Sequence, residues 1–289
     1  NCDCIDGLRQ LDDNSVDATV TSPPYDNLRT YNGNISQWSF EKFQEIAKDL
    51  YRITKDGGVV VGVVGDATIK GSETGTSFRQ ALYFMDCGFN LHDTMIWHKI
   101  SPFQHKNRYI SSFEYMFVFS KGKPKTANII CDRKNKHAGQ TISGAGRMSD
   151  GTTRQLSGAK NKRKIKEYGQ RYNVWHTTPC NSSKERTGHP AQFSEQLAND
   201  HIISWSNEGD TVFDPFLGSG TAVSGDHRLI VGIFIRSRGI FHKDRLVDLA
   251  AELKGIMAHL PRRIHERDAC RGQKSLKHQL HRRRAFFRN

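Results

Sequence analysis

Residues 21–25, with the sequence TSPPY, place a serine and a tyrosine on either side of two adjacent prolines. The segment directly follows the apolar alternation of residues 16–20. Proline has no N–H to donate to a sheet and cannot continue a helix, so an element that reaches Pro23 and Pro24 must end there. The pattern therefore predicts a buried strand, residues 16–21, that ends in a stiff turn carrying Ser22 and Tyr25.

A second stretch whose residues could bind a ligand is DTVFDPFLGSGTA, residues 210–222. Here a short apolar strand ends at Asp214, a turn containing Gly218 and Gly220 follows, and Thr221 begins a predicted helix. Glycines at such a turn let the backbone approach a ligand closely. The turn lacks the lysine of a phosphate-binding P-loop, and its spacing is not GxGxxG. Taken alone, it indicates either a ligand-binding turn or a tight connection.

The elements that must position these two turns alternate between strands and helices. Apolar spacing and turn residues predict strands at 16–21, 59–64, 90–97, 115–120 and 211–213, and helices at 39–53, 78–85, 194–204 and 221–229. Such alternation indicates an α/β fold with a mostly parallel sheet covered on both faces. Ligands of open α/β sheets gather at the carboxyl ends of strands, where both turns are expected.

The charge of the chain is concentrated in two segments. The whole chain carries +13, whereas residues 121–171 have a surplus of 11 positive charges and residues 254–289 a surplus of 9, which leaves −7 for the remainder. An acidic body with two basic extensions points to a polyanion such as nucleic acid. Solvated, flexible segments would give the same pattern.

Composition excludes some classes of protein. Hydrophobic residues make up 36% of the 289, which fits a globular chain with a sizeable core. Apolar runs such as residues 59–64 are too short to cross a bilayer, and no signal peptide is visible. Six cysteines include no CxxC pair, so we expect reduced thiols, no metal site and a cytoplasmic protein.

Together, TSPPY and DPFLGSGT resemble the motifs of DNA amino-methyltransferases, which transfer a methyl group from S-adenosylmethionine to an exocyclic amine of adenine or cytosine. Two further stretches look like family elements: FEYMFVFSKG (residues 113–122) resembles the strand after the catalytic half, and KERTGHPAQF (residues 184–193) the element before the cofactor strand. The catalytic motif comes first, which resembles the permuted beta group. The resemblance covers about residues 1–229.

The resemblance implies a Rossmann-like methyltransferase fold, with a mostly parallel sheet, helices on both faces and a basic irregular insert. It divides the chain into a catalytic half (1–120), a target-recognition insert (121–173), a cofactor-binding half (174–253) and a basic tail (254–289). It also predicts that the turns at 22–25 and 214–221 lie side by side at one edge of the sheet.

The resemblance gives the TSPPY turn a chemical role. An exocyclic amine is a poor nucleophile because its lone pair is delocalised into the ring. The Ser22 hydroxyl and the Pro23 carbonyl can accept hydrogen bonds from the amine and draw it towards tetrahedral geometry. Pro23 and Pro24 hold that carbonyl in a fixed direction, while Tyr25 offers a face on which a flipped base can stack.

For the cofactor, the resemblance implies a site around residues 214–221, with Phe216 against the adenine and backbone N–H groups towards the amino-acid carboxylate. Asp66 and Glu114, at or near strand ends, are further candidates for the cleft. The expected cofactor-binding residues are Asp3, His189, Phe193, Asp214, Phe216, Gly218, Ser219, Gly220 and Thr221.

The basic insert is expected to be mobile, little buried and in contact with double-stranded DNA. Its cations would contact phosphates, and a few side chains would read base edges. The family also implies a bacterial or phage-encoded protein near the nucleoid, with a cognate restriction endonuclease as a possible partner. The candidate DNA-binding residues are Arg147, Arg154, Gln155, Lys160, Lys162 and Arg163.

Two questions stay open. Within the family, Ser at the first motif position is typical of cytosine enzymes, so Ser22 favours N4 of cytosine, with N6 of adenine as the alternative. The segment LIVGIFIRSRG places Phe234 or Arg236 where the family has an acidic residue for the ribose hydroxyls. The chain could therefore be a catalytically weakened DNA-binding relative, and a methyltransferase of the same fold that acts on RNA or protein is a third reading.

Overall fold

The computed structural model describes residues 4–25, 38–99, 106–177 and 194–216. The chain divides into two compact units. One comprises Asn1–Asn128 and Asn173–Leu260, and the other comprises Ile129–Tyr172 and Pro261–Asn289. Each unit is described by itself below.

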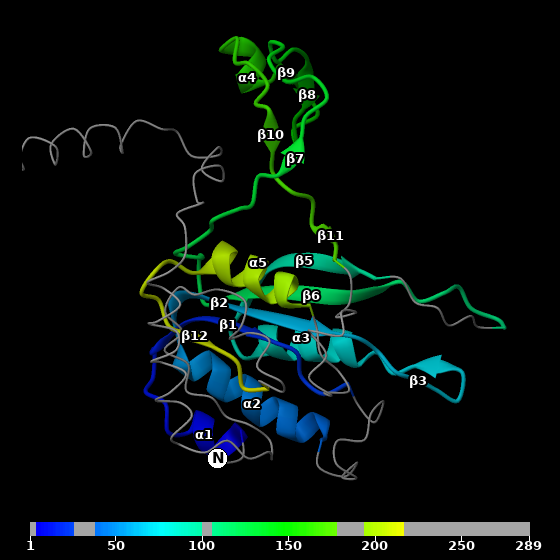
Figure 1. Cartoon of the computed structure of the whole chain (residues 1–289), viewed down its shortest axis with the longest axis vertical. Coiled ribbons are helices and arrows are strands. Elements are labelled where there is room, and N and C mark those ends of the chain that lie inside the picture. Colours follow the sequence, from blue (N-terminus) through cyan, green and yellow to red (C-terminus); the bar gives the residue numbers. More distant parts are fainter. Residues whose placement is uncertain (1–3, 26–37, 100–105, 178–193, 217–289) are drawn as a thin grey trace, which may run out of the picture. The chain divides into compact units, whose positions relative to one another are not determined.

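The first unit is built on a six-stranded sheet with the order β11-β5-β6-β2-β1-β12 (Figure 1). Strand β1 pairs in parallel with both β2 and β12, and β11 is parallel to β5. Strand β6 runs antiparallel to both of its neighbours, β2 and β5. The strands are β1 (Val16–Thr21), β2 (Thr54–Val64), β5 (Asn90–His98), β6 (Phe113–Ser120), β11 (Val174–His176) and β12 (Val212–Phe213).

Helices cover both faces of this sheet (Figure 1). Helices α1, α2 and α3 pack on one face, and α5 packs on the other. The Ser39 side chain caps α2 by accepting a hydrogen bond from the Lys42 backbone N–H. The helices are α1 (Cys4–Leu8), α2 (Phe40–Ile53), α3 (Thr76–Asp86) and α5 (Glu195–Trp205), and a small ladder joins β3 (Thr68–Ile69) to β4 (Ser72–Glu73).

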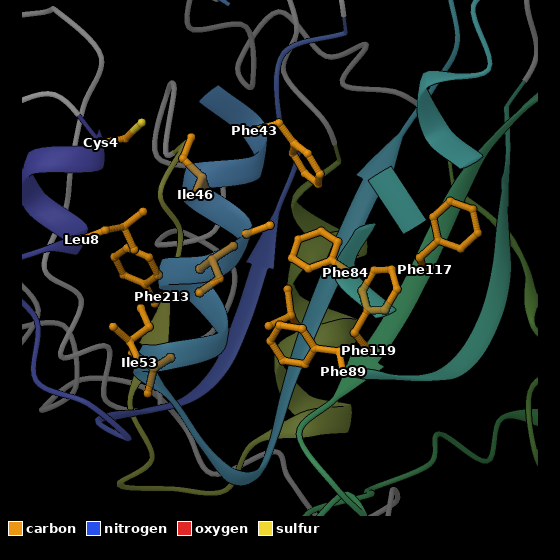
Figure 2. Close-up of a cluster of buried hydrophobic side chains, with 14 of the residues drawn as sticks. Cys4, Leu8, Phe43, Ile46, Ile53, Phe84, Phe89, Phe117, Phe119 and Phe213 are labelled. Carbon is orange, nitrogen blue, oxygen red and sulfur yellow. The ribbon is translucent and has the colours of Figure 1, made fainter. Parts of the chain in front are cut away.

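Two apolar clusters, one on each face, hold the layers together. Val60 and Val64 of β2 belong to the cluster under α2 and α3, whereas Val59, Val61 and Val63 belong to the cluster under α5. A central strand that is apolar on both sides is what a sheet covered by helices requires. Aromatic rings fill the first cluster, including Phe84, Phe89, Phe117 and Phe119 (Figure 2).

Most of the expected elements of the described part are present. The helix predicted at 39–53 ends at Ile53 as expected, and Thr54 caps it. Strand β2 therefore begins five residues before the predicted start and includes Gly57 and Gly58. The helix expected at 221–229 lies outside the described residues. Cys4 and Cys87 carry free thiols, but Cys131 is disulfide-bonded, so the expectation of reduced thiols is wrong at that position.

The described part of the second unit, residues 129–172, is folded from short pieces. They are β7 (Arg133–Lys134), paired with β10 (Tyr168–Gly169), β8 (Ala145–Arg147), paired with β9 (Thr153–Gln155), and α4 (Ser157–Lys160). Within 129–172 Ala159 alone is buried. The expected low burial is thus confirmed, while the segment has more regular structure than its composition predicts. Across the described residues, no helix is long and apolar enough to cross a membrane.

Candidate active site

The two turns singled out in the sequence follow neighbouring strands. Ala18 pairs with Val212, and Thr19 pairs with Phe213, so β1 and β12 run in parallel with their carboxyl ends at the same edge of the sheet. The TSPPY turn leaves β1 there, and Asp214 leaves β12. The prediction that these turns lie side by side is confirmed as far as Phe216, the last described residue of the second turn.

A buried hydrogen bond connects the two turns. The Thr21 hydroxyl donates to Oδ1 of Asp214 at 2.6 Å, across 193 positions of the sequence. The Phe216 backbone N–H donates to the same oxygen at 2.9 Å. Thr21, Pro23 and Phe216 also line one small apolar cavity with side chains of α2 and α3. The first motif thus fixes the start of the second.

The other carboxylate oxygen of Asp214, Oδ2, is buried and has no hydrogen-bond partner among the described residues. Asp214 itself is 4% exposed. Burial raises the pKa of this carboxyl to about 6, against the lowering effect of the bonds from Thr21 and the Phe216 N–H. A buried acceptor without a donor is costly to the fold, and a ligand with a hydrogen-bond donor would satisfy it.

On the other side of the TSPPY turn, side chains form a hydrogen-bonded chain. Ser22 Oγ lies 3.1 Å from the hydroxyl oxygen of Tyr25, and the Tyr25 hydroxyl donates to Oε2 of Glu114 at 3.0 Å. Lys99 Nζ forms an ion pair with Oε1 of Glu114. Glu114 was a candidate cleft residue, whereas Lys99 was missed. The sequence signal that could have found Lys99 was Glu114 itself, a charged residue at an otherwise apolar strand. A buried carboxylate needs a cationic partner.

Asp66, the other candidate cleft residue, has a local partner set. Its carboxylate accepts from the Ser77 backbone N–H at 2.9 Å, from the Ser77 hydroxyl, and from the Thr74 hydroxyl at 3.4 Å. These bonds hold the loop between β2 and the start of α3. The side chain is accounted for by this structural role.

Several candidate cofactor residues lie outside the described part of the chain. They are Asp3, His189, Phe193, Gly218, Ser219, Gly220 and Thr221. Of the expected cofactor set, the structure describes Asp214 and Phe216. Phe216 packs edge to face with Trp38, with ring centroids 5.4 Å apart.

The six candidate DNA-binding residues lie in the second unit and are all exposed. Arg147, Arg154 and Gln155 belong to the β8–β9 hairpin, in which Gly146 pairs with Arg154. Arg154 forms an exposed ion pair with Asp150 at 3.0 Å, which leaves its guanidinium partly engaged. Lys160 ends α4, and Lys162 and Arg163 follow it.

Comparison with known proteins matches residues 16–229 to the N6_N4_Mtase family, described as DNA methylase. The chain belongs to this family. It is 56% identical over 219 residues to the orphan methyltransferase M.BamHII of Bacillus amyloliquefaciens, covering 73% of this chain and 79% of that protein. It is 27% identical over 224 residues to the type II methyltransferase M.HpaI of Haemophilus parainfluenzae, covering 75% of this chain and 62% of that protein.

Among solved structures, the chain is similar to PvuII DNA methyltransferase (cytosine-N4-specific), with a TM-score of 0.56 and 17% identity over 88% of this chain and 91% of that one. This likeness confirms the expected Rossmann-like methyltransferase fold. Membership of the family makes the protein a DNA amino-methyltransferase, and S-adenosylmethionine is the methyl donor of this class. The unpartnered Oδ2 of Asp214 fits such a ligand, which carries an ammonium group and ribose hydroxyls as donors.

The raised pKa of Asp214 predicts a specific dependence of stability on pH. Between about pH 4 and pH 6 the unfolded chain has lost the Asp214 proton and the folded chain retains it, so rising pH lowers the free energy of unfolding. With a folded pKa of about 6 against 3.8, the loss is about 3 kcal/mol. Asp214→Asn removes this term.

We therefore expect urea unfolding of the wild type and of Asp214→Asn, measured from pH 4 to pH 7, to diverge in one direction. The wild type should be relatively more stable at pH 4 and lose that advantage by pH 7. The other carboxyl groups titrate in both proteins and cancel. Parallel curves across this range would contradict an ionisable, desolvated Asp214.

Proposed function

We propose that this protein methylates an exocyclic amine of a base flipped out of double-stranded DNA, and that the amine is N4 of cytosine. The observation that carries the proposal is the bond from Thr21 to Asp214, which ties the amine-binding turn to the start of the cofactor turn. A methyl donor and its acceptor must come within about 3–3.5 Å of each other. Adjacent turns at one edge of a sheet support this reading, because they can place the two groups close together.

In this proposal the chain acts by positioning the amine. The Ser22 hydroxyl oxygen and the Pro23 carbonyl oxygen accept hydrogen bonds from the two N–H groups and localise the nitrogen lone pair. Pro24 limits the directions in which the preceding carbonyl can point. The ring of Tyr25 stacks on the flipped base, a contact worth about 1–3 kcal/mol per base.

S-adenosylmethionine supplies a methyl group on a positively charged sulfur, which is already a strong electrophile. Asp214 and Phe216 are the described residues proposed to hold it, through the free carboxylate oxygen and through ring packing. The proposed set is completed by Asp3, His189, Phe193, Gly218, Ser219, Gly220 and Thr221, on the strength of the family motif.

The choice of cytosine N4 over adenine N6 follows from Ser22, because the resemblance associates serine at this position with cytosine enzymes. Neither base is excluded by size, since a hydroxyl accepts a hydrogen bond from either amine. M.BamHII is described as an orphan methyltransferase and M.HpaI as a type II enzyme. From the same family resemblance we propose a restriction endonuclease as a partner of this chain. We also propose that the protein acts in the cytoplasm, on the bacterial nucleoid.

The base assignment is tested by incubating the protein with duplex DNA and methyl-labelled S-adenosylmethionine, then digesting the DNA to nucleosides. The proposal predicts label in N4-methyl-2′-deoxycytidine, and loss of that label in Ser22→Ala. Ser72→Ala, which changes an exposed serine of the small β3–β4 ladder, serves as the control and should methylate normally. Label in N6-methyl-2′-deoxyadenosine alone would overturn the cytosine assignment. Label in neither, without cofactor binding, would favour the weakened DNA-binding relative.

The proposed DNA contacts predict a change in salt dependence. We expect the triple variant Lys160→Gln, Lys162→Gln, Arg163→Gln to bind duplex DNA more weakly at low salt. If all three cations contact phosphates, the plot of log K against log salt concentration becomes shallower by about 3, since each contact contributes about 0.9. Fluorescence anisotropy with labelled DNA measures this slope.

A matched control neutralises three cations of the α1–α2 region, by Arg9→Gln, Lys42→Gln and Lys48→Gln. It removes the same charge but should leave the slope unchanged. If both triple variants shift the slope equally, the effect comes from net charge, and the proposed contact surface in the second unit is wrong.

A further inference from the structure

The chain from Ser22 through Tyr25 to Glu114 has a defined direction. A phenol has one hydrogen to donate, and among the described residues Oε2 of Glu114 lies 3.0 Å and the Val63 carbonyl oxygen 3.4 Å from the Tyr25 hydroxyl oxygen. The carboxylate is both closer and charged, and charge-assisted bonds are shorter and stronger than neutral ones. Tyr25 therefore donates to Glu114.

The direction of that bond determines the next one. Because the Tyr25 hydrogen points to Glu114, the Tyr25 oxygen can only accept from Ser22 at 3.1 Å, so the Ser22 hydroxyl is the donor. The Ser22 hydrogen is then committed, and its oxygen presents lone pairs. An acceptor is what activation of an amine N–H requires, whereas a hydroxyl pointing its hydrogen at the amine would compete for the nitrogen lone pair.

Strand pairing holds Glu114 at this place. It lies near the start of β6 and pairs with Trp97 of β5, while Tyr115 beside it pairs with Val64. Lys99, just beyond β5, forms the ion pair with Glu114, and its ammonium lies 5.1 Å from the centroid of the Trp97 ring. The Glu114 side chain is 11% exposed. Its carboxylate is therefore held in one position by Tyr25 on one oxygen and Lys99 on the other.

Gly65 keeps the space between these groups open. A Cβ at this position would lie 3.3 Å from Cγ of Glu114 and 3.4 Å from Cε2 of Tyr25. A side chain there would crowd the Glu114 side chain and contact the Tyr25 ring. The end of β2 thus accommodates the link between the turn and β6.

We propose that Glu114, held by Lys99, is a positioning residue that makes Ser22 an acceptor and fixes the ring of Tyr25. This inference rests on the proposed function of the TSPPY turn. A plain structural ion pair between Lys99 and Glu114 is the competing account. In the proposal, activity depends on the Glu114 carboxylate accepting a hydrogen bond from Tyr25. In the competing account, activity depends on the ion pair between Lys99 and Glu114 being intact.

Two substitutions that break the same ion pair separate these accounts. Lys99→Gln keeps the carboxylate, so the order Ser22 to Tyr25 to Glu114 persists. In Glu114→Gln, Lys99 attracts the amide oxygen and leaves the amide NH₂ towards Tyr25. Tyr25 then accepts from that NH₂ and donates to Ser22, which reverses the chain.

The experiment measures single-turnover methyl transfer to duplex DNA, with kcat, KM and the S-adenosylmethionine Kd alongside. We expect Glu114→Gln to lower kcat by about tenfold or more, with small effects on KM and cofactor Kd, since one hydrogen bond to a charged group has that weight. Lys99→Gln should lower kcat much less than Glu114→Gln does. Glu45→Gln, which breaks an exposed pair with Arg9, is the matched control and should match the wild type.

A double variant completes the test. Tyr25→Phe keeps the ring and removes the hydroxyl, so the reversal caused by Glu114→Gln can no longer reach Ser22. Tyr25→Phe combined with Glu114→Gln should therefore be as active as Tyr25→Phe alone. Urea unfolding of each variant shows whether the fold is retained.

Four results would overturn the inference. Equal losses in Lys99→Gln and Glu114→Gln, or losses that multiply in the double variant, would favour the structural ion pair. Wild-type kcat in Glu114→Gln would remove the role altogether while leaving the proposed function intact. A wild-type protein that transfers no methyl group to any DNA would instead overturn the proposed function, and the inference with it.

Discussion

The hydrogen bond from Thr21 to Asp214 is the interaction on which the rest of the site depends. It joins the end of β1 to the end of β12 at 2.6 Å, in a place where the carboxylate is almost fully buried. Burying a carboxylate is costly, and the raised pKa of Asp214 records that cost. The bond fixes the positions of Thr21 and Asp214 relative to each other, although 193 positions separate them. Oδ2 of Asp214 stays available for a ligand.

The direction of each strand decides which residues reach this edge of the sheet. Parallel strands β1, β2 and β12 bring their carboxyl ends to it. Strand β6 is antiparallel to β2, so it brings its amino-terminal end, and Glu114 stands there rather than Ser120. The turn behind β1 is therefore flanked by a carboxylate on each side: Asp214 anchors it from β12, and Glu114 bonds to Tyr25 from β6.

Much of this arrangement could be predicted from the sequence, because it depends on local rules. Period-two apolar residues predicted β1, the continuous apolar run of residues 59–64 predicted β2, and the spacing of Phe43 to Ile53 predicted α2. The prolines ended β1 at the right residue. The motif pair predicted the shared edge. The partners of Thr21 and Tyr25 could not be predicted, because side-chain contacts follow from strand order and direction. Likewise, the short ladders of residues 129–172 lack the apolar periodicity that sequence reasoning relies on.

The central claim is that the TSPPY turn and the start of the cofactor turn form one site. It is tested most directly by the affinity of Thr21→Val for S-adenosylmethionine, measured by calorimetry in the absence of DNA. Thr21 belongs to the catalytic motif, yet the account predicts a Kd at least several-fold weaker, because Asp214 loses its side-chain hydrogen-bond donor. In an Asp214→Asn background, Thr21→Val should raise the Kd for S-adenosylmethionine little further. A Thr21→Val protein that folds normally and binds the cofactor with wild-type affinity would contradict the account.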